Sequence, residues 1–265
     1  MCDENPKQVF AELGVPLPEL ESWHTADTVV FGFPVAAGEA EAVWQRLRAV
    51  FDRSGMWPFI STIGPEEWQL NPERGEEPTR AYLREALRLD PERVVAETVE
   101  GERVYFGYDT ERDGLDLYDL DQILAELGPE PISPEPPRYR FATHYSNRAL
   151  WMYLVRAEAG YAVPALVCAP TWARWPEPGE ESPHVALHDV AFLRSWQDRF
   201  GAELQSIGRT DLEVVVARPP RETRDIARVA IEQYAYCFDL CQILGEPVQL
   251  AHTQVPGDRW YFWWD

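Results

Sequence analysis

Lysine is almost absent from this sequence. Of its 24 basic residues, 23 are arginine and only Lys7 is lysine. A Walker A loop, a protein kinase site and a Schiff-base site each need a lysine at the centre of their chemistry. Lys7 stands in what we interpret as an N-terminal tail, so these sites are excluded unless Lys7 supplies the amine.

Long apolar runs and closely spaced cysteines are missing as well. No stretch approaches the roughly 18 apolar residues of a membrane-spanning helix, and the acidic N-terminus lacks the apolar core of a signal peptide. The four cysteines, Cys2, Cys168, Cys237 and Cys241, match no disulfide framework. We therefore expect free thiols, a cytoplasmic location and no membrane partner.

Several motifs of enzymes and metal sites are also absent. The sequence has no Gly-x-Ser-x-Gly, His-Glu-x-x-His or Gly-x-Gly-x-x-Gly pattern. Residues 144–147 (His-Tyr-Ser-Asn) combine base and nucleophile types, but adjacent residues rarely face one another in a catalytic triad. Residues 109–114 resemble the start of a calcium loop, yet Leu120 occupies the position that requires glutamate. We expect no cofactor.

Negative charge is abundant and unevenly distributed. The chain of 265 residues has a formal net charge of −21 and 12% aromatic residues, a composition typical of a folded acidic protein. Residues 1–135 hold 29 acidic and 11 basic residues, a net charge of −18, whereas residues 136–265 have a net charge of −3. This field repels phosphate backbones, so we expect no nucleic-acid partner.

A proline-rich segment separates the two halves. Residues 128–137 read Gly-Pro-Glu-Pro-Ile-Ser-Pro-Glu-Pro-Pro, which cannot form a helix and has too few amide donors for a central strand. The length is compatible with one large domain or two small ones. We predict an acidic N-terminal α+β domain at 1–128, a linker at 129–137 and a C-terminal domain at 138–265.

Hydrophobic periodicity predicts the elements of the N-terminal half. Runs of β-branched and aromatic residues indicate strands, and apolar residues three and four apart indicate helices. We expect strands at 28–35 and 57–63, helices at 39–53, 79–89 and about 119–127, and a hairpin of 94–99 with 103–108 around Gly101.

Hydrophobic periodicity predicts a second set of elements in the C-terminal half. We expect a hairpin of 150–157 with 161–169, helices at 185–200 and 223–244, strands at 204–207 and 212–217, and a last strand within 260–265, buried on both faces. The order strand, helix, strand, strand, helix, strand is ferredoxin-like. The predicted fold class is therefore α+β, with an antiparallel ferredoxin-like C-terminal domain.

Four segments of this half carry a family resemblance. They are Ser-Trp-Gln-Asp-Arg-Phe-Gly-Ala-Glu-Leu (195–204), Leu-Glu-Val-Val-Val-Ala-Arg-Pro-Pro (212–220), Glu-Gln-Tyr-Ala-Tyr-Cys-Phe-Asp (232–239) and Trp-Tyr-Phe-Trp-Trp-Asp (260–265). They resemble the bacterial domain-of-unknown-function family 4253 over residues 160–265, and Ser-Gly-Met-Trp-Pro (54–58) looks like its usual N-terminal segment. The family usually has proline where Phe238 stands, and Cys241 is outside its pattern. The resemblance implies a fold but no activity.

Two interpretations of the cysteines remain open. Cys237 and Cys241 are four residues apart on a predicted helix, as are His184 and His188, and two Cys with two His suit tetrahedral zinc. Alternatively, the two cysteines continue an apolar helical stripe, in which a free cysteine packs as a small hydrophobe. The stripe is the favoured interpretation, so we expect no metal.

The candidate site residues are charged or aromatic and lie in the family-like region. They are Arg218, Glu232, Cys237, Asp239, Trp260, Trp263 and Asp265. One hypothesis pairs Arg218 with Asp265 and the chain's carboxylate, which would anchor the C-terminus. The other places Glu232, Asp239 and Cys237 near a cleft lined by the two tryptophans, where the carboxylates would act as general acid and base.

The sequence leaves several functions open. The leading hypothesis is a binding protein of the inhibitor or immunity type, whose acidic first half masks a basic partner, because catalytic signatures are missing. The alternative is a small-molecule enzyme that uses carboxylates and an aromatic-lined pocket in the C-terminal domain. A third is a structural subunit whose tryptophan-rich surface docks into an oligomer.

Overall fold

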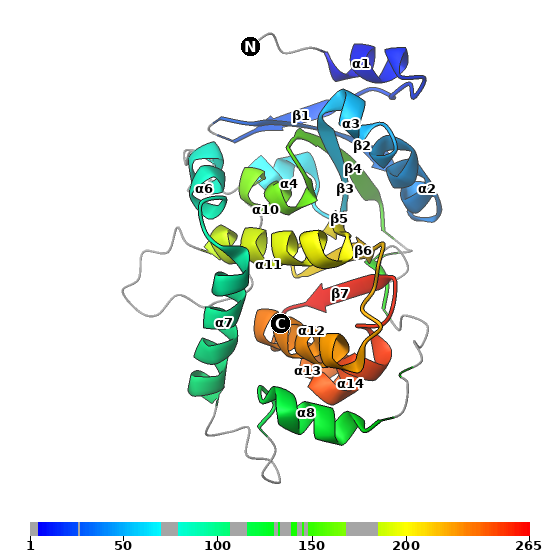
Figure 1. The fold of residues 1–265 in the computed structure, drawn as a ribbon. Coiled ribbons are helices and arrows are strands. Elements are labelled where there is room, and N and C mark those ends of the chain that lie inside the picture. The colour runs from blue at the N-terminus through cyan, green and yellow to red at the C-terminus, as the bar shows by residue number, and fades with distance from the viewer. Residues whose placement is uncertain are drawn as a thin grey trace.

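A seven-stranded sheet organises the chain (Figure 1), in the order β1-β2-β4-β3-β5-β6-β7. The computed structural model describes residues 5–25, 27–69, 79–106, 116–129, 132, 139–141, 145, 148–167 and 185–265. The strands are β1 (Glu21–His24), β2 (Val29–Val35), β3 (Met56–Ser61), β4 (Leu150–Arg156), β5 (Ala202–Ile207), β6 (Asp211–Val216) and β7 (Arg259–Trp263). Only the β3–β5 pair is parallel. The α+β class with a mostly antiparallel open sheet is confirmed.

Strand β4 joins the two halves of the chain. It lies between β2 and β3, with Tyr153 opposite Gly32 on one side and opposite Phe59 on the other. From residue 185 onward the chain follows the predicted order of helix, two strands, helical segment and last strand, but β3 separates β4 from β5. The two-domain and ferredoxin-like details are therefore not confirmed. The boundary at 129–137 stays a prediction, because most of it lies outside the described residues.

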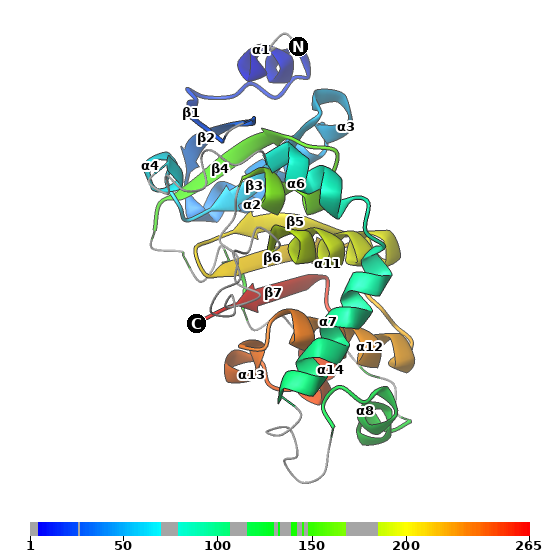
Figure 2. The ribbon, with the colours of Figure 1, turned by 90° about the vertical axis from the view of Figure 1, so that its left-hand side faces the viewer.

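Helices cover both faces of the sheet. One face carries α11 (Val185–Phe200) and α12 (Thr223–Tyr236), and α6 (Thr79–Ala86) and α7 (Pro91–Phe106) pack outside α11. The other face carries α2 (Ala37–Arg48), whose Trp44 donates a hydrogen bond to the Pro58 carbonyl at 2.9 Å. Figure 2 shows the strands stacked from β2 down to β7, with α6 and α7 towards the viewer.

Short elements complete the fold. They are α1 (Pro6–Glu12), α3 (Phe51–Ser54), α4 (Pro65–Gln69), α8 (Leu120–Leu127), the 3-10 turn η1 (Gly160–Ala162), α10 (Val163–Leu166), α13 (Leu240–Ile243) and α14 (Pro247–Thr253). Of these, α8 and α14 pack against α12. The last strand therefore lies under a layer of helices.

Aromatic side chains fill the core between β7 and the helices. Trp196 of α11 stacks on Phe262 at 5.3 Å between ring centroids and meets Trp260 and Tyr236 edge to face at 5.5 and 5.4 Å. Such pairs contribute about 0.5–1.5 kcal/mol beyond the area they bury. The prediction of a last strand buried on both faces is confirmed, because only Trp263 of β7 is half-buried.

Three predicted strands are wrong: the two of the hairpin at 94–108 and the one at 161–169. Residues 94–108 do not form a hairpin: α7 runs through Gly101 to Phe106. Val95 and Thr98 are buried three residues apart on the helix, and α7 packs along α11, so packing overrides the strand propensity of valine and threonine. The strand predicted at 161–169 is instead η1 and α10, with Pro164 in the first turn of α10. Residues 168–169 lie outside the described part.

Most of the other predicted elements are confirmed, with small changes at their ends. The helix predicted at 39–53 is two helices, α2 followed by α3. The helix predicted at 223–244 is also two helices, α12 followed by α13. Cys237 and Cys241 therefore do not share one helix. The short elements β1, α1 and α14 were not predicted, because their few residues carry too little periodicity.

Candidate functional site

The sheet face opposite α11 is polar over β5, β6 and β7, although it is buried. Gln205, Asp211, Glu213, Arg259 and Tyr261 share this face, and none is more than 7% exposed. Their strand neighbours point to the aromatic core, because successive side chains alternate between faces. Charged and apolar residues alternate within 211–214, and this alternation is the sequence signal of the polar face. It matches no short functional motif, so these residues were not among the predicted site residues.

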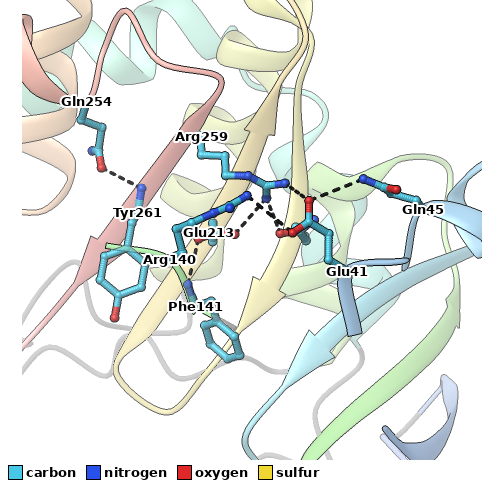
Figure 3. A network of polar contacts seen from close by, with 9 residues as sticks. Glu41, Gln45, Arg140, Phe141, Glu213, Gln254, Arg259 and Tyr261 are labelled. Carbon is cyan, nitrogen blue, oxygen red and sulfur yellow. Dashed lines mark hydrogen bonds and ion pairs between the residues drawn. The ribbon is translucent and has the colours of Figure 1, made fainter. Parts of the chain in front are cut away.

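An ion-pair network lies at the centre of the polar face (Figure 3). Arg259 donates hydrogen bonds to Gln205 Oε1 at 2.7 Å and to Glu213 Oε1 at 3.2 Å, and it pairs with Glu41 of α2. The amide of Phe141 donates to Glu213 Oε2 at 2.9 Å. Burial raises the pKa of Glu213, and these partners oppose that rise. The network joins three strands, α2 and residue 141, and so fixes the polar face.

Asp211 lies on the same face, two residues before Glu213 at the start of β6. Its Oδ2 accepts a hydrogen bond from the Tyr261 hydroxyl at 3.0 Å. Burial raises the pKa of Asp211 to about 7, hydrogen bonding to Tyr261 and Tyr145 lowers it, and the nearby charge of Glu213 raises it. Burial also raises the pKa of both tyrosines, which therefore remain protonated donors. Asp211 thus holds or releases a proton near neutral pH.

A cleft of about 360 Å³ opens beside Asp211. It is lined by residues from separate parts of the chain: Thr62, Ile63, Glu67, Tyr145, Arg148, Arg209, Thr210 and Trp263. Strands β3, β5 and β7 run in the same direction, so their carboxyl ends meet at this edge.

The charges of the cleft differ from those of the whole chain. Arg209 forms an ion pair with Glu67, and the Arg148 guanidinium lies over the Tyr145 ring at 5.6 Å from its centroid. The lining therefore carries a net charge of +1, whereas the chain carries −21. Trp263 contributes an aromatic residue to the lining. A site of this kind can hold a small polar molecule.

Among the predicted site residues, Trp263 lines the cleft. Trp260 is fully buried and donates its indole N–H to the Val255 carbonyl at 3.1 Å. The carboxylate of Glu232 accepts hydrogen bonds from Arg199 at 2.8 and 2.9 Å and from Trp196 at 2.9 Å. Burial raises the pKa of Glu232, and the Arg199 charge opposes this. The structure places Glu232 in a buried pair between α11 and α12.

Three further predicted residues lie around the end of β7. The buried thiol of Cys237 donates to the Trp263 carbonyl at 3.0 Å, and burial raises the pKa of this thiol well above its ordinary value. Asp239 Oδ2 accepts a hydrogen bond from the amide of Asp265 at 3.1 Å. These side chains satisfy backbone groups next to the last strand, as expected at a protected sheet edge.

The predicted ion pair between Arg218 and Asp265 is wrong. Strands β6 and β7 are antiparallel, with Asp211 opposite Trp263 and Val215 opposite Arg259. Arg218 therefore follows one end of the strand pair, and Asp265 follows the other. The six residues of β6 lie between them and span roughly 20 Å at about 3.3 Å per residue, which keeps the two charges apart.

The proposed zinc ligands are only partly described. Cys237 follows α12, Cys241 lies in α13 and His188 lies in α11. Within the described ranges, no group of three or more His, Cys, Asp or Glu residues is placed to hold a metal ion. His184 lies outside those ranges, so the expectation of no metal stays a prediction.

Other predictions also fall on residues that are not described. These are Cys2, Cys168, residues 109–114, His144, Ser146 and Asn147. A separate prediction concerned membranes. In the part of the chain that the structure covers, no helix has the length and apolar character needed to cross a bilayer.

Comparison with known proteins identifies the C-terminal part of the chain. Residues 152–265 match the family model described as Domain of unknown function (DUF4253), which confirms the resemblance. The match begins within β4, so residues 54–58 lie outside it. Because β3 stands between β4 and β5, the matched residues form a continuous sheet only together with β3. No curated protein and no solved structure matches the chain.

Proposed function

We propose that the protein binds a small polar molecule in the cleft at the carboxyl ends of β3, β5 and β7. The observation that carries this proposal is the convergence of eight side chains from separate segments on one cleft, with two arginines, two threonines and a tryptophan among them. Concave sites with an apolar wall and a few convergent polar groups are the usual form of small-molecule sites.

The surroundings of the cleft support a preformed site. The Tyr153 hydroxyl donates to the Ile63 carbonyl at 2.8 Å and holds the turn after β3. On the opposite wall, the Trp264 amide donates to the Thr210 carbonyl at 2.9 Å, next to Trp263. Residues held by packing and hydrogen bonds bind a ligand with less loss of conformational entropy.

A ligand screen tests this proposal. Thermal unfolding of the protein is measured with sets of small carboxylates, phosphate esters and neutral polar compounds. We expect at least one class to raise the unfolding temperature, and we expect Trp263→Leu and Arg148→Gln to lose the effect. Arg224→Gln is the matched control, because Arg224 is exposed in α12, which begins beyond the opposite end of β6. A ligand effect that both cleft variants retain would refute the assignment.

A second candidate function uses the acidic surface. Helices α7 and α8 expose Glu97, Glu100, Asp121 and Glu126, and every ionisable side chain of α8 is acidic. We propose, as the alternative, that this surface binds a basic protein. The cleft proposal is preferred, since acidic surface residues alone define no geometry.

The acidic-surface candidate has its own test. Binding of a lysine-rich polypeptide is measured at low and high salt for a variant with Glu97, Glu100, Asp121 and Glu126 changed to amides. The control variant changes Glu12, Glu39, Asp52 and Glu85, which are equally exposed. If the surface binds its partner specifically, the first variant loses more binding of the polypeptide than the control variant does. Equal losses of binding would indicate non-specific attraction alone.

A further inference from the structure

Tyr145 connects the cleft to the buried carboxyl of Asp211. Its side chain lines the cleft, and its phenol is hydrogen-bonded to and electrostatically coupled with Asp211. Thr210, which also lines the cleft, is the chain neighbour of Asp211. Asp211 itself is fully buried. A charge placed in the cleft therefore acts on the buried Asp211 carboxyl across Tyr145, which is itself half-buried.

We infer that the cleft takes an anionic small molecule and that Asp211 takes up a proton when the anion binds. This inference rests on the proposed function and deepens it by naming the class of ligand. It concerns carboxylate, sulfate or phosphate groups, which share acceptor oxygens and negative charge.

The arginines favour an anion. Arg209 is partly neutralised by Glu67, but among the described residues no carboxylate pairs with Arg148. The guanidinium of Arg148 lies over an aromatic ring, an arrangement that orients its donors without using all of them. Thr62 and Thr210 also line the cleft, and both side chains carry a hydroxyl group. Arginine and hydroxyl donors together are the usual partners of oxyanions.

The carboxyl beneath the cleft opposes an anion unless it is protonated. The groups that face Asp211 are Tyr261 from β7, Tyr145 from the segment before β4 and Glu213 from its own strand, and the Arg148 charge lies over the Tyr145 ring. The acidic neighbour Glu213 is already paired with Arg259. A second negative charge nearby favours the neutral form of a carboxyl. Because the pKa of Asp211 is raised to about 7, this carboxyl can take up a proton near neutral pH when an anion binds.

Sulfate is a suitable probe because its charge does not change between pH 6 and pH 8.5. Its dissociation constant is measured by titration calorimetry at both pH values, with sodium chloride at matched ionic strength as the reference. If binding raises the pKa of Asp211 by about one unit, the affinity is about five- to tenfold higher at pH 6 than at pH 8.5. Repeating the titration in buffers of different ionisation enthalpy counts the protons taken up.

Three variants separate the parts of the inference. Arg148→Gln is expected to weaken sulfate binding at least tenfold, while the control Arg224→Gln leaves it unchanged. Asp211→Asn keeps the size of the side chain and an acceptor for Tyr261, so it is expected to bind sulfate with the same affinity at both pH values. Tyr145→Phe keeps the ring under Arg148 and is expected to reduce the pH dependence less than Asp211→Asn does.

The outcomes also distinguish this inference from the proposed function. Sulfate binding without proton uptake, or pH dependence that persists in Asp211→Asn, overturns the assignment of the proton to Asp211. If sulfate fails to bind while a neutral compound binds and loses affinity in Trp263→Leu, the anion inference is wrong and the proposed cleft function stands. If no compound of any class binds, both are wrong.

Discussion

The hydroxyl of Tyr236 donates a hydrogen bond to Oδ1 of Asp189 at 2.6 Å in the interior between α12 and α11. Asp189 is 1% exposed, and burial raises its pKa to about 7, although the hydrogen bond from Tyr236 lowers it. It is a second buried carboxyl, between two helices rather than on the polar face, and it gains or loses its proton near neutral pH.

Asp189 makes stability depend on pH. Between its ordinary pKa of 3.8 and about 7, the folded protein holds a proton that the unfolded chain has lost. The free energy of unfolding therefore falls as pH rises through this window, and the loss is complete above it. We predict that Asp189→Asn, which still accepts from Tyr236, is about 1–3 kcal/mol more stable than wild type at pH 8.

Urea unfolding of both proteins at pH 5 and pH 8 checks this prediction. The raised pKa of Asp211 also makes the free energy of unfolding fall as pH rises. The contribution of Asp189 is therefore the difference in stability between the variant and the wild type at each pH. The difference is expected to shrink at pH 5, where the native carboxyl is neutral. A variant that loses stability relative to wild type as pH rises would contradict the assignment.

Gly208 makes room for the carboxyl of Asp211. A Cβ atom on Gly208 would overlap Asp211 Oδ1 and lie 3.1 Å from the Phe141 ring. We predict that Gly208→Ala lowers the free energy of unfolding by about 1–3 kcal/mol through this overlap. Gly38→Ala is the control, because a Cβ there meets nothing within 4 Å and α2 gains a better helix former.

A double-mutant cycle tests whether Asp211 is the obstacle. Removal of the carboxyl by Asp211→Ala should reduce the cost of Gly208→Ala, and the coupling energy is read from chemical denaturation of the four proteins. Purely additive effects would show that the backbone, rather than the carboxyl, resists the substitution.

The pair of Arg199 and Glu232 is unequally buried. The Glu232 side chain is 5% exposed and the Arg199 side chain is 20% exposed. Arg199→Met leaves a buried carboxylate without its partner, and we predict that it lowers the free energy of unfolding by about 3 kcal/mol. Glu232→Gln leaves an arginine that can reach water, so we expect a smaller loss of stability. Denaturation at pH 7 gives both values.

Acid provides an internal check on this pair. At pH 5 the stranded carboxyl of the Arg199→Met variant is protonated more readily, so its deficit relative to wild type should diminish. A deficit that is the same at both pH values would indicate lost packing of the arginine stem instead.

Cys237 is expected to be unreactive in the native protein. Its thiol is buried, bonded to the Trp263 carbonyl, and has a raised pKa, so little thiolate is available. We predict that alkylation by iodoacetamide, followed by peptide mass, labels Cys237 only in urea, while half-buried Cys241 reacts sooner. Native labelling of Cys237 at the rate seen in urea would contradict this placement.

Local patterns predicted most of the secondary structure. The helix at 185–200 and the strand at 28–35 are recovered because their periodicity is contained within a few turns or residues. Residues 94–108 were assigned wrongly because valine and threonine favour strands in isolation, and only packing of α7 against α11 makes them helical.

The candidate site was predicted much less well. Trp263 was selected from its place in an aromatic strand, whereas Arg148 and Arg209 lie in turns and carry no motif. Glu232 and Asp239 were selected as carboxylates near apolar runs, but such residues are also the ones that form buried pairs. The alternation at Asp211 and Glu213 is the one local sign of the polar face.

Composition and periodicity thus sufficed for the acidic charge, the α+β class, the order of elements from residue 185 onward and the buried last strand, since each depends on neighbouring residues. The position of β4 between β2 and β3, the parallel pairing of β3 with β5, and the meeting of Arg148, Arg209 and Trp263 at one sheet edge depend on the tertiary structure. Strand pairing joins backbone groups far apart in the chain, and no local pattern encodes which strands become neighbours.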